Sequence, residues 1–361
     1  MRLVVDCRYV RRDGRHDGIS RFSAGITAAL GRLHPLTMLI DDPRQLALLP
    51  ALPYLVIRPP AHPLEPLISG VIRRRARPDV LYSPMQTTGS IGRRYGYVPT
   101  LHDLIYYRHR TPPAEFAWWV RLLWRLAYLS TLPQRVLLDR GDEVVTVSAT
   151  TAAQIAEHRL TARRVTVVPN AADVAPLDAV APGPRSRSLI YMGAFIGYKN
   201  VETLVRAVAL LPEYELHLLS PIDAPVRRGL QVVAPAARLH FHDGVTDAEY
   251  VALLDDAVAL VSASRDEGFG IPVVEAMTRG VPVVLSDIPI FREVGGDAAL
   301  YADPDDPASF ATAVHALERP GEWNARSKAA LAQAATFTWD ASAARLLPVL
   351  QRVAAARRRS G

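Results

Sequence analysis

The sequence predicts an α/β protein of two domains, each built on a parallel sheet with helices on both faces. Short β-rich apolar runs alternate with helical segments along the whole chain, and its 361 residues exceed what one hydrophobic core usually supports. An Ala-, Pro- and Gly-rich stretch with neither periodicity separates two such series. We therefore expect domains over 1–173 and 188–338, a linker over 174–187, and a closing helix over 339–361 that packs back toward the first domain.

The individual elements follow from β-rich runs and from helical spacing. Predicted strands of the first domain cover Leu3–Cys7, Tyr54–Ile57, Asp79–Tyr82, Pro99–His102, Glu143–Val147 and Val165–Val168. Those of the second cover Leu189–Met192, Glu215–Leu219, Ala257–Val261 and Val281–Leu285. Expected helices include Ser20–Leu33, Ala114–Leu138, Val201–Leu211 and Trp339–Ala356, the last with a frayed tail over Ala354–Arg359.

Composition and the chain start indicate a folded cytoplasmic protein. Hydrophobic residues make up 49% and charged residues 22%, close to globular averages. The apolar start is interrupted at Asp6, too soon for a signal peptide, and no run of 18 apolar residues follows. The one cysteine, Cys7, lies in an apolar run and is expected to be a small buried hydrophobe. We expect the cytoplasm, or the inner face of the membrane.

The net charge of +6 is consistent with attraction to phosphates on nucleic acid, lipid or nucleotide. Charge alone does not distinguish these three kinds of partner. Of the 42 basic residues, only Lys199 and Lys328 are lysine. Because arginine serves almost everywhere else, a lysine in this chain is informative.

The densest chemical motif runs from Ser264 to Met277, after a predicted strand and into a helix. Its glycines allow close backbone approach, Pro272 suits a first helical turn, and the N–H groups there point toward bound anions such as a diphosphate. Glu267 and Glu275 are separated by seven residues, so they can accept hydrogen bonds from hydroxyls at opposite ends of a ligand. The alternative is that Glu275 only complements the helix dipole.

At this motif the chain resembles the large family of retaining glycosyltransferases with the GT-B fold, group 1 or family four, whose signature is Glu, seven residues, Glu. The resemblance extends over nearly the whole chain. Other similar segments are Asp17–Phe22, His102–Leu104, Thr146–Ser148, Val168–Asn170, Gly193–Asn200, Gly280–Val284 and Gly296–Ala299.

The resemblance implies two Rossmann-like domains facing across a cleft and a nucleoside diphosphate sugar as donor. It assigns the ribose to Glu275 and a donor-sugar hydroxyl to Glu267. Backbone groups of the segment Gly268, Phe269, Gly270 and Ile271 would then face the sugar and phosphates. Family members hold the base near the segment matching Gly244 and Val245.

Lys199 is expected to bind the diphosphate and stabilise it as the leaving group, the alternative being a solvated surface charge. Asn200 is a predicted cap for the helix that follows. The family often has an arginine a few residues earlier, where this chain reads Ala194-Phe195-Ile196-Gly197. Arg21 is a candidate for the missing charge.

Two further site residues are predicted in the first domain. His102 ends an apolar strand, where open α/β sheets place ligands, and resembles the histidine of the family's His-Asp pair near the transferring carbon. Asp103 is expected to form a turn. Gly18 would let the backbone close over the phosphates, as the family's glycine loop does, the alternative being a plain turn.

No metal is predicted. Asp303-Pro304-Asp305 matches the Asp, any residue, Asp pattern that glycosyltransferases of another fold use for a divalent ion. Neighbouring Asp306 and Pro307 favour turn formation and helix capping instead.

The acceptor side is suggested by aromatic and apolar residues interspersed with arginines over 114–138, and by the basic run Arg73–Arg77. Such a helix is typical either of a membrane interface or of packing against its own domain. We hypothesise peripheral membrane contact that brings a lipid-linked or polymeric saccharide to the first domain. No nucleic-acid partner is expected.

The resemblance implies transfer of a hexose, mannose or glucose, to an acceptor hydroxyl in surface-polysaccharide or glycolipid assembly, with retained configuration and with GDP-mannose favoured as donor. Two alternatives stay open. A sugar-nucleotide epimerase can share the architecture but needs no acceptor, and a noncatalytic nucleotide-sugar-binding partner would bind the donor without turnover.

Overall fold

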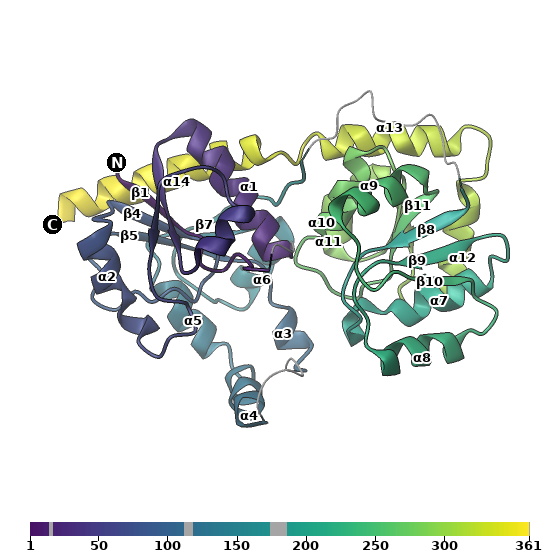
Figure 1. Cartoon of the computed structure of the whole chain (residues 1–361), viewed down its shortest axis with the longest axis horizontal. Helices are drawn as coiled ribbons and strands as arrows, with labels where there is room; N and C mark the ends of the chain where they lie inside the picture. The colour runs from purple at the N-terminus through teal and green to yellow at the C-terminus, as the bar shows by residue number, and fades with distance from the viewer. Residues whose placement is uncertain (14–16, 112–117, 174–185, 361) are drawn as a thin grey trace. The chain divides into compact units, whose positions relative to one another are not determined.

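The computed structural model describes residues 1–13, 17–111, 118–173 and 186–360. The chain folds into two compact units, one formed by Met1–Ala171 with Trp339–Gly361 and the other by Ala172–Thr338 (Figure 1). Most of the predicted linker, residues 174–185, lies outside the described residues. Both units are α/β with parallel sheets, as the alternation of elements predicts.

The first unit contains a sheet of seven parallel strands in the order β3-β2-β1-β4-β5-β6-β7, counted over the described residues. Its strands are β1 Leu3–Asp6, β2 Leu36–Ile40, β3 Tyr54–Val56, β4 Val80–Ser83, β5 Gly96–Leu101, β6 Val144–Thr146 and β7 Val165–Val167. Its helices are α1 Gly18–Leu33, α2 Ile68–Arg75, α3 Ile105–Arg108, α4 Trp118–Ala127, α5 Leu132–Asp139, α6 Ala149–Glu157 and α14 Trp339–Ser360.

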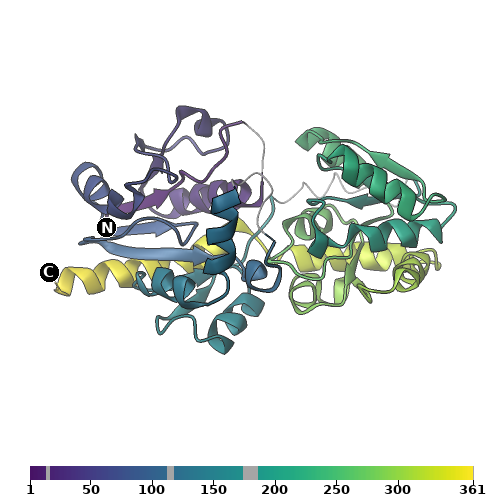
Figure 2. The same ribbon diagram turned by 90° about the horizontal axis from the view of Figure 1, so that it is seen from below.

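Strand alternation sorts the helices of this unit onto the two faces of the sheet. Tyr97 of β5 joins the α2 residue Ile72 in one buried cluster. Gly96, the preceding residue, faces Val353 of α14, which packs along α1 (Figure 2). The sheet is therefore the middle layer of three.

The second unit contains a sheet in the order β10-β9-β8-β11-β12-β13. Its strands are β8 Ser188–Tyr191, β9 Glu215–Leu218, β10 Leu239–Phe241, β11 Ala259–Ser262, β12 Val283–Ser286 and β13 Leu300–Ala302. Its helices are α7 Val201–Ala209, α8 Ala224–Val233, α9 Asp247–Asp256, α10 Ile271–Thr278, α11 Pro289–Gly295, α12 Pro307–Ala316 and α13 Glu322–Ala334. One face packs against α7, α8 and α12 through a large buried apolar cluster.

Three strands are absent from the prediction. β2 follows α1 after only His34 and Pro35, so its apolar run continues the helical pattern without a gap. β10 and β13 are three residues long, and both lie at edges of the sheet. Short edge strands bury little apolar surface, and their sequence pattern is correspondingly weak.

The predicted helix Ala114–Leu138 is wrong as one element. Residues 114–117 lie outside the described part, and beyond them α4 and α5 are separate. A second helix, α5, begins after the break. Ser130 Oγ accepts a hydrogen bond from the N–H of Leu132 at 3.1 Å, and Pro133 lies in the first turn of α5.

The predicted fraying of the tail is also wrong. α14 continues to Ser360, and its last turns are held by ion pairs from Arg357 to Asp142 and from Arg358 to Asp79. Ala354 is buried within the first unit. The basic tail is thus part of a packed helix.

Cys7 is buried and free, as predicted, and burial raises the pKa of its thiol to about 12. Among the described residues, no helix combines the length and the apolar character needed to cross a bilayer.

Candidate active site

The strand order of the second sheet places two loops at one point. The chain runs outward from β8 to β10 on one side and from β11 to β13 on the other, so the loops after β8 and β11 diverge at the carboxyl ends of adjacent strands. Such switch points are where open α/β sheets bind ligands. Lys199 follows β8 in the short 3-10 helix η4, Gly197–Lys199, and Glu267 follows β11.

Lys199 and Glu267 form an ion pair at this point. Lys199 Nζ donates to Glu267 Oε1, and Ser264 Oγ donates to the same oxygen at 3.0 Å. The two charged side chains are only 16% and 12% exposed, so water screens their attraction poorly. The structure thus joins two residues 68 positions apart that were predicted to contact different parts of one ligand. Ser264 was not singled out by the sequence as a partner of the glutamate.

Asn200 holds the loops around this pair together. Its backbone is left-handed, with φ of 53°, and its Nδ2 donates to the carbonyl oxygens of Ala263 at 3.1 Å and Pro304 at 2.6 Å. It occupies the N-cap position of α7, but its side chain caps no amide, so that part of the prediction is wrong. The reason is tertiary: the side chain is used to bridge neighbouring loops instead.

The segment that enters α10 exposes backbone and buries side chains. Gly270 has φ of +89°, a conformation that favours glycine, and a Cβ there would lie 3.0 Å from a ring carbon of Phe291. Backbone conformation and available space therefore both favour glycine at this position. Phe269 is buried edge-on against Phe337, with ring centroids 5.5 Å apart. Pro272 lies in the first turn, as predicted, and the N-cap residue Gly270 has no side chain with which to cap the helix. Amides at such a helix start are suited to binding an anion.

Glu275 and Val245 occupy the same domain as the ion pair. Glu275 lies in α10, half-buried, one turn past its start. Val245 follows the turn of Asp243 and Gly244, whose φ values of 55° and 103° reverse the chain after β10. Because all strands are parallel, this turn lies at the same edge of the sheet as the loops that carry Lys199 and Glu267.

The three aspartates near Pro304 serve structural contacts. Asp303 Oδ1 accepts from the N–H of Asp305 at 2.8 Å, Asp305 pairs with Arg265, and Asp306 caps α12. Turn formation and capping, as predicted, account for this motif.

In the first domain, His102 follows β5 and is fixed in orientation. Its Nε2 lies 2.7 Å from the carbonyl oxygen of Pro84, and its ring meets Phe22 edge-on at 4.9 Å. Burial lowers its pKa, so the ring is neutral and donates through Nε2, which leaves Nδ1 as an acceptor. Asp103 forms the predicted turn, because Oδ1 accepts from the N–H of Ile105 at 3.0 Å. Gly18 is exposed at the start of α1.

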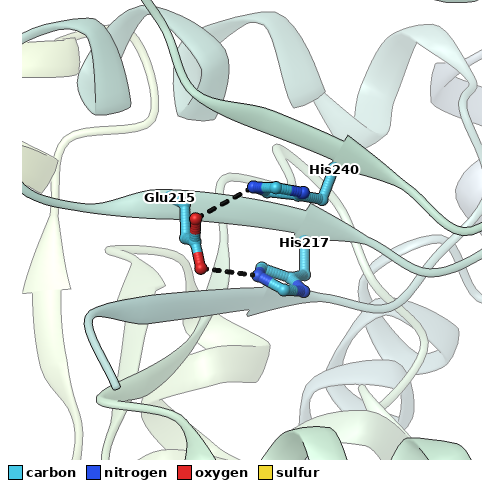
Figure 3. Close-up of side chains that lie close together, drawn as sticks. All are labelled: Glu215, His217 and His240. Carbon is cyan, nitrogen blue, oxygen red and sulfur yellow. Dashed lines mark hydrogen bonds and ion pairs between the residues drawn. The ribbon is translucent and has the colours of Figure 1, made fainter.

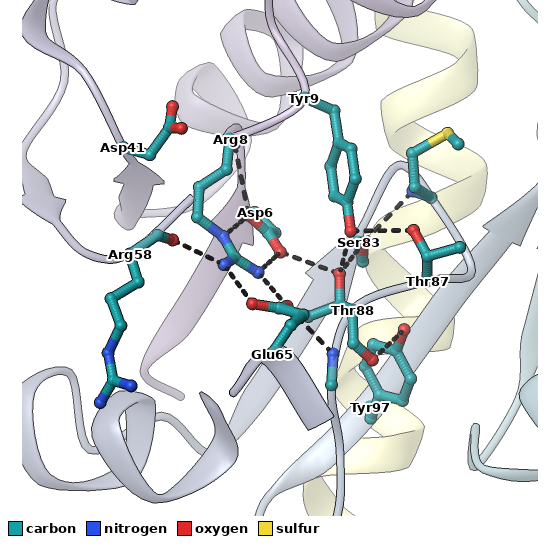
Figure 4. Close-up of polar contacts among 12 residues, drawn as sticks. Asp6, Arg8, Tyr9, Asp41, Arg58, Glu65, Ser83, Thr87, Thr88 and Tyr97 are labelled. Atoms are coloured by element: carbon teal, nitrogen blue, oxygen red, sulfur yellow. Dashed lines mark hydrogen bonds and ion pairs between the residues drawn. The ribbon is translucent and has the colours of Figure 1, made fainter. Parts of the chain in front are cut away.

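A buried ionic network at the switch point of the first sheet was not predicted (Figure 4). Arg8 donates to both oxygens of Asp6 at 2.8 Å and to both oxygens of Glu65 at 2.7 and 2.8 Å, and its side chain is fully buried. Thr88 donates to Asp6 at 2.8 Å and lies within hydrogen-bond distance of Ser83. The network ties the ends of β1 and β4 to neighbouring loops. The sequence signal was a charged Asp-x-Arg that begins at the last residue of an apolar strand.

These features define the GT-B class of fold, two Rossmann-like domains with parallel sheets. The chain is similar to sucrose-phosphate synthase of Thermosynechococcus elongatus, with a TM-score of 0.75 at 20% identity over 99% of this chain and 100% of that one. A model described as Glycosyltransferase Family 4 matches residues 17–175, and one described as Glycosyl transferases group 1 matches residues 186–319. The chain belongs to the group 1 glycosyltransferase family.

Curated relatives are mannosyltransferases by name. The chain is 30% identical over 190 residues to the O-antigen chain mannosyltransferase RfbU of Salmonella typhimurium, covering 51% of this chain and 53% of that protein. It is 31% identical over 196 residues to the GDP-mannose:cellobiosyl-diphosphopolyprenol alpha-mannosyltransferase of Xanthomonas campestris, covering 49% and 50%. The chain spans about half the length of these relatives.

Proposed function

We propose that this protein is a metal-independent, retaining hexosyltransferase that moves mannose from GDP-mannose to a hydroxyl of a lipid-linked or polymeric saccharide. The observation that carries the proposal is the shielded Lys199–Glu267 pair beside the start of α10, where the N-cap residue is a glycine. A compact cation, aligned amides and a carboxylate are the groups needed to bind a diphosphate and a sugar hydroxyl side by side. The names of the mannosyltransferase relatives favour mannose, and that of the Xanthomonas relative favours GDP-mannose.

Lys199 and the α10 amides would stabilise the leaving diphosphate. In the transfer, the bond from the sugar's anomeric carbon to the phosphate oxygen breaks, the bond to the acceptor oxygen forms, and the acceptor's proton passes to the departing phosphate. The donor would draw Lys199 away from Glu267, since a diphosphate carries more negative charge than one carboxylate. Ser264 would stay on Oε1, and Oε2 would accept from the sugar hydroxyl.

The other predicted residues complete the proposed site. Glu275 would bind the ribose, and Gly244 with Val245 would lie against the base. In the first domain, Gly18 would approach the phosphates and His102 Nδ1 would accept from a donor or acceptor hydroxyl. The fixed orientation of the His102 ring supports a positioning role of this kind.

An apolar surface on α4 and α5 supports membrane contact by the first domain. Trp118 is 78% exposed, and large apolar side chains around it are also exposed, namely Trp119, Leu122, Leu123, Leu126, Leu129, Leu132 and Val136. Trp124 packs inward from α4, with rings of Tyr106 and Tyr128 at 5.0 and 4.3 Å, and Leu138 is buried at the end of α5. Figure 1 shows α4 projecting from its domain. Exposed aromatics beside the arginines at 121 and 125 are typical of interfacial helices.

The test of the reaction combines donor screening with two glutamate variants. GDP-mannose should raise the Tm more than UDP or ADP sugars, and label should move to a polyprenol-linked saccharide. Glu267→Ala should slow transfer by about 100-fold or more. Glu275→Ala should weaken GDP binding by roughly 10–100-fold, as the loss of charged hydrogen bonds does. Glu157→Ala, at the exposed end of α6, is the matched control.

Three results would overturn the proposal. Conversion of the donor sugar without any acceptor would indicate an epimerase, and donor binding without transfer to any saccharide would indicate a noncatalytic partner. Transfer at the wild-type rate by Glu267→Ala would show that the proposed site is not the active site.

Membrane contact has its own test. The double variant Trp118→Ser with Leu122→Ser should lose co-sedimentation with anionic liposomes at low salt, whereas Val232→Ser, at an exposed apolar residue of α8, should not. Absence of wild-type binding at low salt would refute the contact and leave the transferase proposal intact.

A further inference from the structure

Three side chains of types that can bind a metal lie together on one face of β9 and β10, away from the loops that carry the proposed donor site. His217 and His240 are direct partners in the parallel register, and Glu215 lies two residues before His217 on the same face. The alternate residues, such as Leu216 and Leu218, pack into the core on the other face. Figure 3 shows the two imidazoles reaching the one carboxylate from adjacent strands.

The distances suit a small tetrahedral ion. Glu215 Oε1 lies 3.3 Å from His217 Nε2, and Oε2 lies 2.9 Å from His240 Nε2. One ligand atom from each of the three residues lies within 4.8 Å of the others. Zinc bonds of about 2.0–2.2 Å place tetrahedral ligand atoms about 3.4 Å apart. Small side-chain rotations would therefore bring all three onto one ion.

A second layer of contacts orients these ligands. His242 Nε2 lies 3.1 Å from His217 Nδ1, and the two rings stack at 5.2 Å. Ser188 Oγ lies 3.4 Å from both His217 Nε2 and Glu215 Oε1. A partner on the remote ring nitrogen is the usual support of a metal-bound histidine, because it fixes the ring and directs the other nitrogen to the metal.

We propose that Glu215, His217 and His240 bind a divalent first-row transition metal, zinc foremost, with His242 positioning His217. Two imidazoles and one carboxylate, with a place left for water, form a common zinc ligand set. The ion would fasten the short edge strand β10 to β9. This site is separate from the transferase chemistry and leaves the prediction of metal-independent transfer unchanged.

One nearby charge opposes the ion. Arg238 lies 3.3 Å from Glu215 Oε2 and is mostly exposed, so it can turn outward when a metal binds. Two unit positive charges about 4 Å apart in water repel each other enough to weaken binding by about fivefold. Arg238→Met should therefore tighten zinc binding by at least about fivefold.

The experiment measures zinc directly on chelator-treated, untagged full-length protein. Zinc chloride should bind at one ion per chain, seen by competition with a coloured chelator, and should raise the Tm. His240→Ala should weaken this binding by about 100-fold or more, since even loss of an outer-layer partner typically costs 10–100-fold. His242→Ala should fall in that lower range. His240 is 49% exposed on an edge strand, so its removal should leave the fold intact.

His315→Ala provides the matched control, because His315 also pairs with a glutamate, Glu318, at 3.0 Å. This variant should bind zinc like the wild type, and cobalt should give a tetrahedral visible spectrum with both but not with His240→Ala. Absence of a one-to-one zinc site in the wild type, or equal affinity in wild type and His240→Ala, would overturn the proposal. Neither outcome depends on transferase activity.

Discussion

Replacing Lys199 by methionine tests the proposed donor site most directly, because it removes one charge and keeps most of the side chain's volume. In the ligand-free protein, this substitution leaves the carboxylate of Glu267 with the Ser264 hydroxyl but without its cation. Two unit charges about 4 Å apart attract by about 4 kcal/mol at an effective dielectric constant near 20.

The net loss of stability is smaller than this gross attraction. Removing one partner of a fully buried pair costs about 3–5 kcal/mol. The cost should be lower here, because the side chains of Lys199 and Glu267 are still 16% and 12% exposed. We expect a loss of about 2 kcal/mol, which lowers the Tm by about 4–8 °C in a domain of this size. The fold should survive.

The loss of transfer should be larger than the loss of stability. A positioned group that stabilises the charge of a leaving group contributes about 10²–10³-fold to turnover. Lys199→Met should therefore slow transfer by that factor even at temperatures where it is fully folded. Lys199→Arg should also impair it, because a planar guanidinium cannot replace a compact ammonium in this shielded loop.

The assay follows release of nucleoside diphosphate and transfer of labelled sugar, alongside thermal melting. Lys328→Met is the control, since Lys328 is the other lysine of the chain and is exposed on α13. The double variant Lys199→Met with Glu267→Gln tests the effect of the lysine on stability alone. It should recover the Tm, because no buried charge is left unpaired, while its transfer stays low because Glu267 is also changed. Transfer at the wild-type rate by the single variant Lys199→Met would refute a direct role of Lys199 on the diphosphate.

Two further predictions concern the first domain. Burial lowers the pKa of His102 from 6.5, so the folded state binds fewer protons there than the unfolded state, and the contribution of His102 to stability falls as the pH decreases below about 6.5. In urea titrations between pH 7 and 5, His102→Asn should therefore reduce the loss of stability toward acid pH. An unchanged loss of stability in this variant would contradict the prediction. Arg8→Met should destabilise the protein by about 3–5 kcal/mol, because Asp6 and Glu65 would remain buried without their cation. Arg44→Met, at an exposed pair, should leave the urea midpoint unchanged, and equal effects of both variants would refute the buried network.

Local features of the chain were determined by the sequence itself. The alternation of strands and helices, the α10 start at Gly270 and Pro272, and the turn at Asp103 each depend on residues within a few positions. Backbone preference, helix-start chemistry and apolar periodicity act at that range, so one sequence was enough to predict the fold class. The same rules were weakest for three short strands and for the break between α4 and α5.

Contacts between distant segments were decided only by the tertiary structure. The sequence marked Lys199 and Glu267 separately, and the strand order brought them together across 68 positions. The Glu215, His217 and His240 cluster depends on the register between β9 and β10, and β10 was not predicted at all. Likewise, Arg8 meets Glu65 57 positions away. Sequence spacing relates residues within one segment of the chain. The partners of a charged or metal-binding side chain come from distant segments, so only the tertiary structure decides them.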